Sequence, residues 1–340
     1  MDNRTFGSVL GALAGLSLAV VPVAGQVPKV ATPATSAART AAAAKASIRA
    51  RTPWGAPDLQ GIWTFKTITP FERPAQFAGK EFLTEDEAAA LEKQAAFSNA
   101  DEERPADPAR DVATAYNKFW WDRGDKVVKT RRSSLIVEPS DGRLPALTPE
   151  AKQRVDVRAA AMGRPAHGPE DRSQFERCVT RGLPRLPGGY NQNLQILQTP
   201  EHVVLLYEMM REARLIALDG RAHIGQGLQQ WMGDSRGRWD GDTLIVETTN
   251  FNNRQEFRGA TQNLRLVERF TRVDAETIDY QLTANDPATW VKPWTAAIPL
   301  TKISDQMYEY ACHEGNYGMP NLLHGARAED KAAEQRGRTK

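Results

Sequence analysis

From Leu194 onward, hydrophobic and polar residues alternate with a period of two, which is typical of β-strands that bury one face. Turn residues divide this region into candidate strands at 194–199, 202–209, 212–218, 230–239, 243–251, 264–273, 277–284, 289–303 and 306–313. Many consecutive strands with short connections indicate an antiparallel barrel or sandwich. We therefore predict a mainly β fold in which residues 191–318 form an antiparallel meander.

The clearest turn signal in this region is Asp240-Gly241, because Asp-Gly suits the two-residue type I′ loop of a hairpin. A loop at this point sets the register of both flanking strands. The expected facing pairs are Gly237–Leu244, Ser235–Val246 and Gly233–Thr248 on one face, and Asp234–Glu247, Arg236–Ile245 and Arg238–Thr243 on the other. The two glycines of the first strand are expected to let a neighbouring chain or a ligand approach closely.

The preceding region, residues 53–190, is rich in proline, and we expect it to form a mixed wrap of helices and loops. Thr84 and Glu87 form a capping box, in which each side chain binds a backbone N–H at the start of a helix. Pro149 follows Thr148 and suits the first turn of a second helix, because its missing donor costs nothing there. Between the helices we expect a charged loop at 101–111 and an aromatic plug or lid at 116–121.

The amino end has the pattern of an export signal. Phe6 to Gly25 is an apolar run that follows Arg4 and ends in small residues suited to a signal peptidase. We expect cleavage near Gln26, with a retained membrane anchor as the alternative. Because no other apolar run reaches the roughly 18 residues needed to span a bilayer, we expect no membrane span in the mature protein and a periplasmic or secreted location.

The predicted organisation has a signal peptide at 1–26, a flexible Ala/Pro-rich linker at 27–52, a single β-rich domain at 53–328 and a C-terminal tail at 329–340. Residues 27–50 contain Lys29, Arg39, Lys45 and Arg49 and no acidic residue, so they account for the formal net charge of +2 of the 340-residue chain. No folded region is strongly basic, and we therefore expect no nucleic-acid partner.

The two cysteines, Cys178 and Cys312, are far apart in the sequence. In an oxidising compartment, one long-range disulfide is the simplest interpretation. Two buried free thiols or a catalytic cysteine are the alternatives.

Several motifs resemble known proteins. Gly61-Ile62-Trp63 resembles the Gly-x-Trp opening of lipocalin-like barrels. The strings WMGDSRGRWDGDTLIVETTNF, ERFTRVDAETIDYQLTANDPATWVKPWT and YEYACHEGNYG resemble a large family of exported bacterial proteins of unassigned function, over essentially residues 53–328. The resemblance implies a lipocalin-like barrel and export, and it implies no activity. The lipocalin comparison implies a pocket for an apolar or aromatic small molecule.

Asp234, Arg236 and Glu247 form a predicted polar cluster on one face of the hairpin. If this face lines the barrel, Arg236 can bind a carboxylate or an enolate and an acid can move a proton. If this face instead points to solvent, the alternative is that the three side chains form a salt-bridge ladder without a catalytic role. Of the five histidines, His313 is our candidate acid or base, and a structural role beside Cys312 is its alternative.

Four further residues are candidate ligand contacts. Trp231 and Trp239 fall on the face opposite the charged cluster, so only one of these two groups can line the interior. Tyr190 and Asn193 belong to a polar loop that enters the first strand of the meander, where amide groups can cap the barrel mouth.

Two short motifs suggest other chemistry. Gly233-x-Ser235-x-Gly237 matches the nucleophile pattern of serine hydrolases, but a hairpin and a strand follow it instead of the helix that a nucleophile elbow requires. His313-Glu314 matches half of a zinc-binding helix, but Tyr317 stands in place of the second histidine. We expect no metal and no cofactor.

These observations predict an exported β-barrel that binds a small apolar or aromatic molecule. If it is an enzyme, we expect cofactor-independent proton-transfer chemistry of a lyase, isomerase or cyclase. A serine-type hydrolase using Ser235 and a non-catalytic envelope scaffold are the alternatives. The substrate and the oligomeric state are not predicted.

Overall fold

The computed structural model describes residues 50–99, 107, 122–254 and 256–338. The predicted signal peptide, almost all of the predicted linker and the aromatic run 116–121 lie outside these residues. Within the described ranges, no helix combines the length and the apolar composition needed to cross a bilayer.

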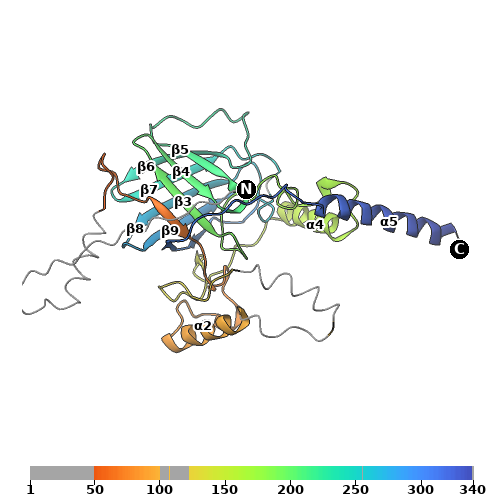
Figure 1. Cartoon of the computed structure of the whole chain (residues 1–340), viewed down its shortest axis with the longest axis horizontal. Helices are drawn as coiled ribbons and strands as arrows, with labels where there is room; N and C mark the ends of the chain where they lie inside the picture. The colour runs from red at the N-terminus through yellow and green to blue at the C-terminus, as the bar shows by residue number, and fades with distance from the viewer. Residues whose placement is uncertain (1–49, 100–106, 108–121, 255, 339–340) are drawn as a thin grey trace, which may run out of the picture. The chain divides into compact units, whose positions relative to one another are not determined.

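The fold is mainly β and is built around a closed barrel, as predicted (Figure 1). In the described part of the chain, nine strands form a ring in the order β11-β1-β3-β4-β5-β6-β7-β8-β9, and a pairing of β11 with β9 closes it. Their bounds are β1 Gly61–Thr64, β3 Asn193–Gln198, β4 His202–Tyr207, β5 Ala213–Ala217, β6 Asp234–Asp240, β7 Thr243–Thr249, β8 Arg265–Arg272, β9 Thr277–Asn285 and β11 Leu300–Ile303. Neighbouring strands are antiparallel except β5 and β6, which meet in a short parallel pairing. Two further strands, β10 (Trp294–Ala297) and β2 (Ile136–Glu138), extend the sheet beyond β9.

The alternation in the sequence places every second side chain inside the barrel. On β9, Ile278, Tyr280 and Leu282 are buried, whereas the polar residues between them are partly exposed. Burial of each such side chain contributes about 1.5–3 kcal/mol. The Tyr280 ring stacks on Phe270 of β8, with 4.6 Å between the ring centroids. Trp63 of β1 is also fully buried, so large side chains occupy much of the interior.

The hairpin of β6 and β7 forms, but its predicted register is wrong by two residues. Asp240 pairs with Thr243, so the two-residue loop is Gly241-Asp242 instead of Asp240-Gly241. Gly241 has a φ of +58° at the first loop position, whereas Asp242 at the second position does not have a positive φ, so the turn is of type II′ rather than type I′. Because the shift is two residues, each side chain stays on its predicted face. The observed pairs include Ser235–Thr248, Arg236–Glu247 and Gly237–Val246.

Two predictions for the last strands are wrong. The region 289–303 contains two strands, β10 and β11, because Pro299 between them cannot donate a ladder hydrogen bond. The segment 306–313 is not a strand. The segment is instead attached through its Tyr308 N–H, which donates to Glu208 at 3.4 Å, and through the disulfide of Cys312 with Cys178.

Both predicted helices form with their predicted caps. At the start of α2 (Glu85–Asn99), the Thr84 N–H donates to the Glu87 carboxylate at 2.8 Å, and the Glu87 N–H donates to the Thr84 hydroxyl at 3.2 Å. At the start of α4 (Pro149–Gly163), the Ala151 N–H donates to the Thr148 hydroxyl at 3.1 Å. Short 3-10 helices cover Ala75–Phe77, Pro169–Asp171 and Met209–Arg211.

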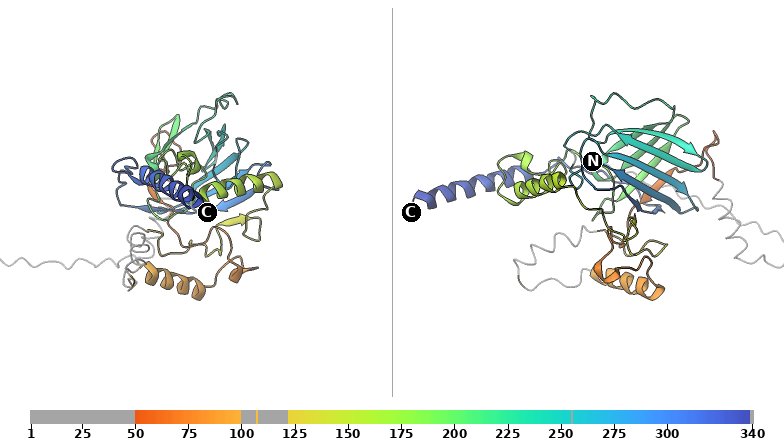
Figure 2. Two further views of the ribbon diagram at one scale, coloured as in Figure 1. Left: turned by 90° about the vertical axis from the view of Figure 1, so that its right-hand side faces the viewer. Right: turned by 180° about the vertical axis from the view of Figure 1, so that it is seen from behind.

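A further helix, α5 (Gly318–Arg338), includes most of the predicted C-terminal tail. The Arg327 guanidinium on α5 donates to the carbonyl groups of Ala166 and His167, at 2.7 and 2.8 Å. The helix therefore lies against the segment that follows α4 (Figure 2).

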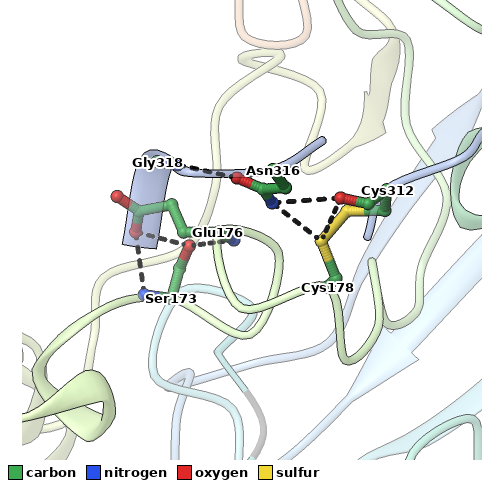
Figure 3. The surroundings of a disulfide bond; sticks show 6 residues. All are labelled: Ser173, Glu176, Cys178, Cys312, Asn316 and Gly318. Carbon is green, nitrogen blue, oxygen red and sulfur yellow. Dashed lines mark hydrogen bonds between the residues drawn. A yellow bond between two sulfur atoms is a disulfide. The ribbon is translucent and has the colours of Figure 1, made fainter. Parts of the chain in front are cut away.

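The predicted disulfide between Cys178 and Cys312 is present, with 5.8 Å between the Cα atoms (Figure 3). The Asn316 amide donates to the Cys312 carbonyl at 3.0 Å and to the Cys178 sulfur at 3.4 Å. The Asn316 side-chain oxygen accepts from the N–H of Gly318, the first residue of α5, at 3.0 Å. The disulfide thus joins the segment before α5 to the loop that contains Ser173 and Glu176.

Candidate functional site

The structure decides which face of β6 lines the barrel. Ser235 and Gly237 face inward, whereas Asp234 and Arg236 are on the outer face, where Asp234 pairs with His223. A Cβ atom on Gly237 would lie 2.7 Å from side-chain atoms of Ile216 in the neighbouring strand β5. The predicted close approach at this glycine is therefore confirmed, and the approaching group is β5.

The barrel interior holds a charged pair, Arg214 with Glu268, that was not predicted from the sequence. Both side chains are almost completely buried and form an ion pair. The Arg214 Nε donates to the Ser235 hydroxyl at 2.7 Å, and the Tyr280 hydroxyl donates to the Glu268 carboxylate at 2.9 Å. A signal was present for Glu268, because it occupies an inward position between the buried residues Leu266 and Phe270 of β8. Burial, together with the nearby Glu268 charge, raises the pKa of Tyr280 well above its usual value.

Ser235 does not lie in the surroundings of a hydrolase nucleophile. Its hydroxyl is buried and bonded to Arg214 and to Thr248, the latter at 3.0 Å. β6 continues from Ser235 into the hairpin loop, so no helix N-terminus follows the serine as a nucleophile elbow requires. Ser235 therefore belongs to the polar network of the barrel core.

On the outer face, the structure brings the predicted polar cluster together around a histidine. His223 Nδ1 lies 2.8 Å from Asp234 Oδ2, and His223 Nε2 lies 3.7 Å from Glu247 Oε1. The second carboxylate oxygen of Asp234 is 3.0 Å from Arg236 Nη2. The Asp234 side chain is 8% exposed and the His223 side chain 24% exposed, so a buried carboxylate holds a histidine that solvent can reach.

Main-chain groups fix this cluster further. Asp234 Oδ2 also accepts from the Ile224 N–H at 3.2 Å. Arg236 donates through Nε to the Ala222 carbonyl and through Nη1 to the Ser235 carbonyl, at 3.1 and 3.2 Å. Each of the three guanidinium nitrogens of Arg236 is thus in contact with the protein, and one of them pairs with Asp234.

Asn250 holds the loop that carries His223 against the barrel. Its amide nitrogen is 3.1 Å from the carbonyl oxygens of Ile224, Gly225 and Leu228. Asn250 follows β7 with a φ of +58°, a conformation that asparagine tolerates better than most residues. The loop therefore has a defined position over β6 and β7, which the strand pattern alone does not indicate.

The structure does not place His313 in this cluster. His313 lies in the exposed segment beside Cys312. Among the described residues, Asp234, Arg236 and Glu247 form no hydrogen bond or ion pair with it. The histidine of the cluster is His223, which comes from a loop and was not chosen as the acid or base in the sequence analysis.

The candidate ligand contacts lie on separate segments. Trp231 precedes β6, so strand parity does not apply to it, whereas Trp239 is on β6 and packs against the core. Tyr190 lies in the chain before β3, and Asn193 begins that strand. Asn193 accepts at its main-chain carbonyl from the Glu208 N–H at 2.9 Å, so it is part of the barrel wall near one mouth.

Comparisons with family models, with curated proteins and with solved structures gave no match to this chain. Among the described residues, no group of three or more histidine, cysteine, aspartate or glutamate side chains has the arrangement of a metal site. The candidate site therefore rests on the geometry of His223 and its neighbours.

Proposed function

We propose that this chain is an exported protein that performs acid–base chemistry on a small molecule at the outer face of β6 and β7. One observation carries the proposal: the buried Asp234 carboxylate holds the partly exposed imidazole of His223 at 2.8 Å. A histidine oriented by a carboxylate is suited to accept and return a proton. In this proposal, the acid–base role belongs to His223 and not to His313, the residue predicted from the sequence.

The hydrogen bond sets the tautomer of neutral His223. Because the Asp234 carboxylate can only accept, the proton of His223 is on Nδ1, and Nε2 carries the lone pair. Nε2 accepts a proton from a carbon beside a substrate carbonyl: the C–H bond breaks, an N–H bond forms, and the electron pair moves to the carbonyl oxygen. Returning the proton to another carbon of the conjugated system gives an isomer. The Glu247 carboxylate, 3.7 Å from Nε2, stabilises the imidazolium.

The proposed substrate class is based on the composition of the loop that carries His223. Leu228, on the loop that carries His223, has a 64% exposed side chain, and Trp231 follows on the same loop. These side chains favour an apolar or aromatic carbonyl compound. Arg236 acts as a positioning residue for Asp234.

Two features support export. The apolar run from Phe6 to Gly25 has the composition of a signal peptide. The disulfide between Cys178 and Cys312 belongs to a class of bond that is rare in reducing compartments. Mass spectrometry of the protein recovered from the periplasm is expected to show a mature N-terminus near Gln26.

Solvent exchange tests the acid–base site without knowledge of the full reaction. Aromatic and apolar carbonyl compounds that bind the mature protein are incubated with it in D₂O, and deuterium incorporation at carbon is measured by NMR. We expect exchange with at least one compound, and a loss of about 10²–10⁴-fold in the His223→Gln variant. Asp234→Asn is expected to slow exchange as well, because the imidazole loses its fixed tautomer.

His313→Gln is the matched control and is expected to exchange at the rate of the unaltered protein. Equal exchange by His223→Gln and the unaltered protein would exclude His223 as the base. If no bound compound exchanges, the protein is a binding protein without this chemistry. If no compound binds, the scaffold alternative is favoured.

A further inference from the structure

A second concave site lies outside the barrel. It is a cavity of about 670 Å³, lined by residues of α4, of the chain around Gln174 and of the segment around Gly259. Its volume is within the range of small-molecule pockets, roughly 300–1,000 Å³. None of the residues of the His223 cluster lines it, so it is independent of the proposed acid–base site.

The wall formed by α4 is largely apolar. Val155, Ala159 and Met162 line the cavity and follow one another at spacings of four and three residues, which places them on one face of the helix. Met162 is 41% exposed. This face therefore offers an apolar strip that an acyl or alkyl chain can cover.

The lining as a whole carries an excess of positive charge, to which α4 itself contributes Arg154 and Arg158. The charged lining residues are the arginines Arg154, Arg158, Arg177, Arg254 and Arg258 and the acids Glu170 and Glu256. The two acids cannot neutralise five guanidinium groups, so the cavity favours an anionic ligand.

The structure distinguishes bonded from available arginines. Arg158 pairs with Glu256 at 2.9 Å, and Arg154 donates to main-chain carbonyls at 3.0 and 2.9 Å. Arg258 lies 3.9 Å from Glu72. In contrast, Arg177 and Arg254 bond to other described residues only through their main chains. Their guanidinium groups are thus the donors that a ligand can use.

The loop that carries Arg177 has a defined position. The Arg177 N–H donates to the Ser173 carbonyl at 3.1 Å, and the next residue, Cys178, is in the disulfide. The facing segment is joined to the same loop, because the Gln174 N–H donates to the Glu256 carboxylate at 2.8 Å. Both available arginines are therefore on segments that contact each other.

We propose that this cavity binds a small single-chain amphipathic anion. Arg177 and Arg254 hold its carboxylate or phosphate group, and its apolar chain lies along Val155, Ala159 and Met162. Charge-assisted hydrogen bonds from guanidinium groups fix the head group, and the apolar strip favours a hydrocarbon tail over a simple inorganic anion.

Titration calorimetry on the mature, disulfide-bonded protein tests this assignment. The probes are decanoate and decyl phosphate, with decyl maltoside as the uncharged amphipath and acetate as the head group alone. We expect both decyl anions to bind, and decyl maltoside and acetate to bind at least about tenfold more weakly. Arg177→Gln and Arg254→Gln are each expected to weaken decanoate binding about tenfold. Arg238→Gln, an exposed arginine of β6 outside the cavity, is the matched control and should leave binding unchanged.

Other outcomes would overturn the assignment. Equal binding of decyl maltoside and decanoate, with no effect of the two arginine variants, would leave an apolar site without anion recognition. Acetate binding as tight as decanoate binding would exclude the apolar strip. Binding only to phosphatidylglycerol vesicles, with none to free decanoate, would indicate a membrane surface instead of a cavity ligand.

The Ala159→Trp variant, in which the larger side chain fills the apolar strip, tests the location of the site. If this variant binds decanoate as tightly as the unaltered protein, the ligand lies elsewhere. Absence of all binding would also contradict the proposal.

Discussion

Inside the barrel, the guanidinium of Arg214 on β5 is paired with the carboxylate of Glu268 on β8. The two residues are 54 positions apart in the sequence, and neither has appreciable solvent exposure. Removing two charges from water is costly, and only good mutual geometry with further hydrogen bonds offsets that cost. Ser235, Thr248 and Tyr280 supply these hydrogen bonds.

Glu268→Gln is expected to destabilise the protein by about 3–5 kcal/mol, because it leaves Arg214 buried without a counter-charge. Replacing both residues, as in Arg214→Met with Glu268→Met, should cost less than the single change. The measurement is the free energy of unfolding from urea titrations of the three proteins. A Glu268→Gln protein within 1 kcal/mol of the unaltered one would show that the pair is not required for stability.

Stability is expected to fall at alkaline pH. Burial is the main cause that raises the pKa of Tyr207 and of Tyr280 in the folded protein. In the unfolded chain these tyrosines ionise near pH 10. Their contribution is therefore fully present below about pH 10 and is lost as pH rises above it, at up to about 1.4 kcal/mol per pH unit for each tyrosine.

Urea unfolding between pH 7 and 11.5 measures this loss. Tyr280→Phe is expected to be less stable at pH 7, since the Glu268 carboxylate loses a donor, but to lose stability less steeply above pH 10. A variant with the same alkaline slope as the unaltered protein would contradict the role of Tyr280. In ultraviolet titrations of the folded protein, two of the seven tyrosines should resist ionisation.

The close approach of β5 to β6 predicts an effect of adding a single methyl group. A Cβ on Gly237 would lie 2.7 Å from side-chain atoms of both Ile216 and Leu218. Gly237→Ala is therefore expected to destabilise the barrel by about 1–3 kcal/mol through overpacking. Gly188→Ala is the control, because nothing lies within 4 Å of its added Cβ. Thermal unfolding of both variants provides the comparison, and equal melting temperatures would be inconsistent with the β5–β6 packing.

Loss of the disulfide is expected to destabilise the oxidised protein. The bond between Cys178 and Cys312 spans 134 residues, for which the loop-entropy model gives about 4–5 kcal/mol. Cys178→Ser with Cys312→Ser should unfold at lower urea concentration and show no further change on addition of reductant. If the double variant matches the oxidised protein in stability, the crosslink has only a local role, at the start of α5.

Local signals in the sequence were sufficient for several elements. The period of two predicted most strands of the barrel, because alternate burial is a property of each strand alone. Thr84 with Glu87, and Thr148 with Pro149, predicted the starts of α2 and α4, since a helix cap is satisfied within a few residues. For the β6–β7 hairpin, the prediction of which residues share a face was correct although the predicted register was not. A shift of two residues moves each residue to a new partner but leaves its side chain on the same face of the sheet.

Local patterns in the sequence were thus enough to predict the fold class, which residues of a strand share a face and the helix caps, and they made a disulfide the simplest interpretation of the two cysteines. Only the tertiary structure decided that Asp234 and Arg236 lie outside the barrel, that Arg214 and Glu268 meet inside it, and that His223 joins Asp234. It also decided that Arg177 and Arg254 line one cavity beside α4. The physical reason is that alternation records only whether a side chain is buried, whereas these contacts depend on strand order, ring closure and loop placement, which join residues distant in the chain.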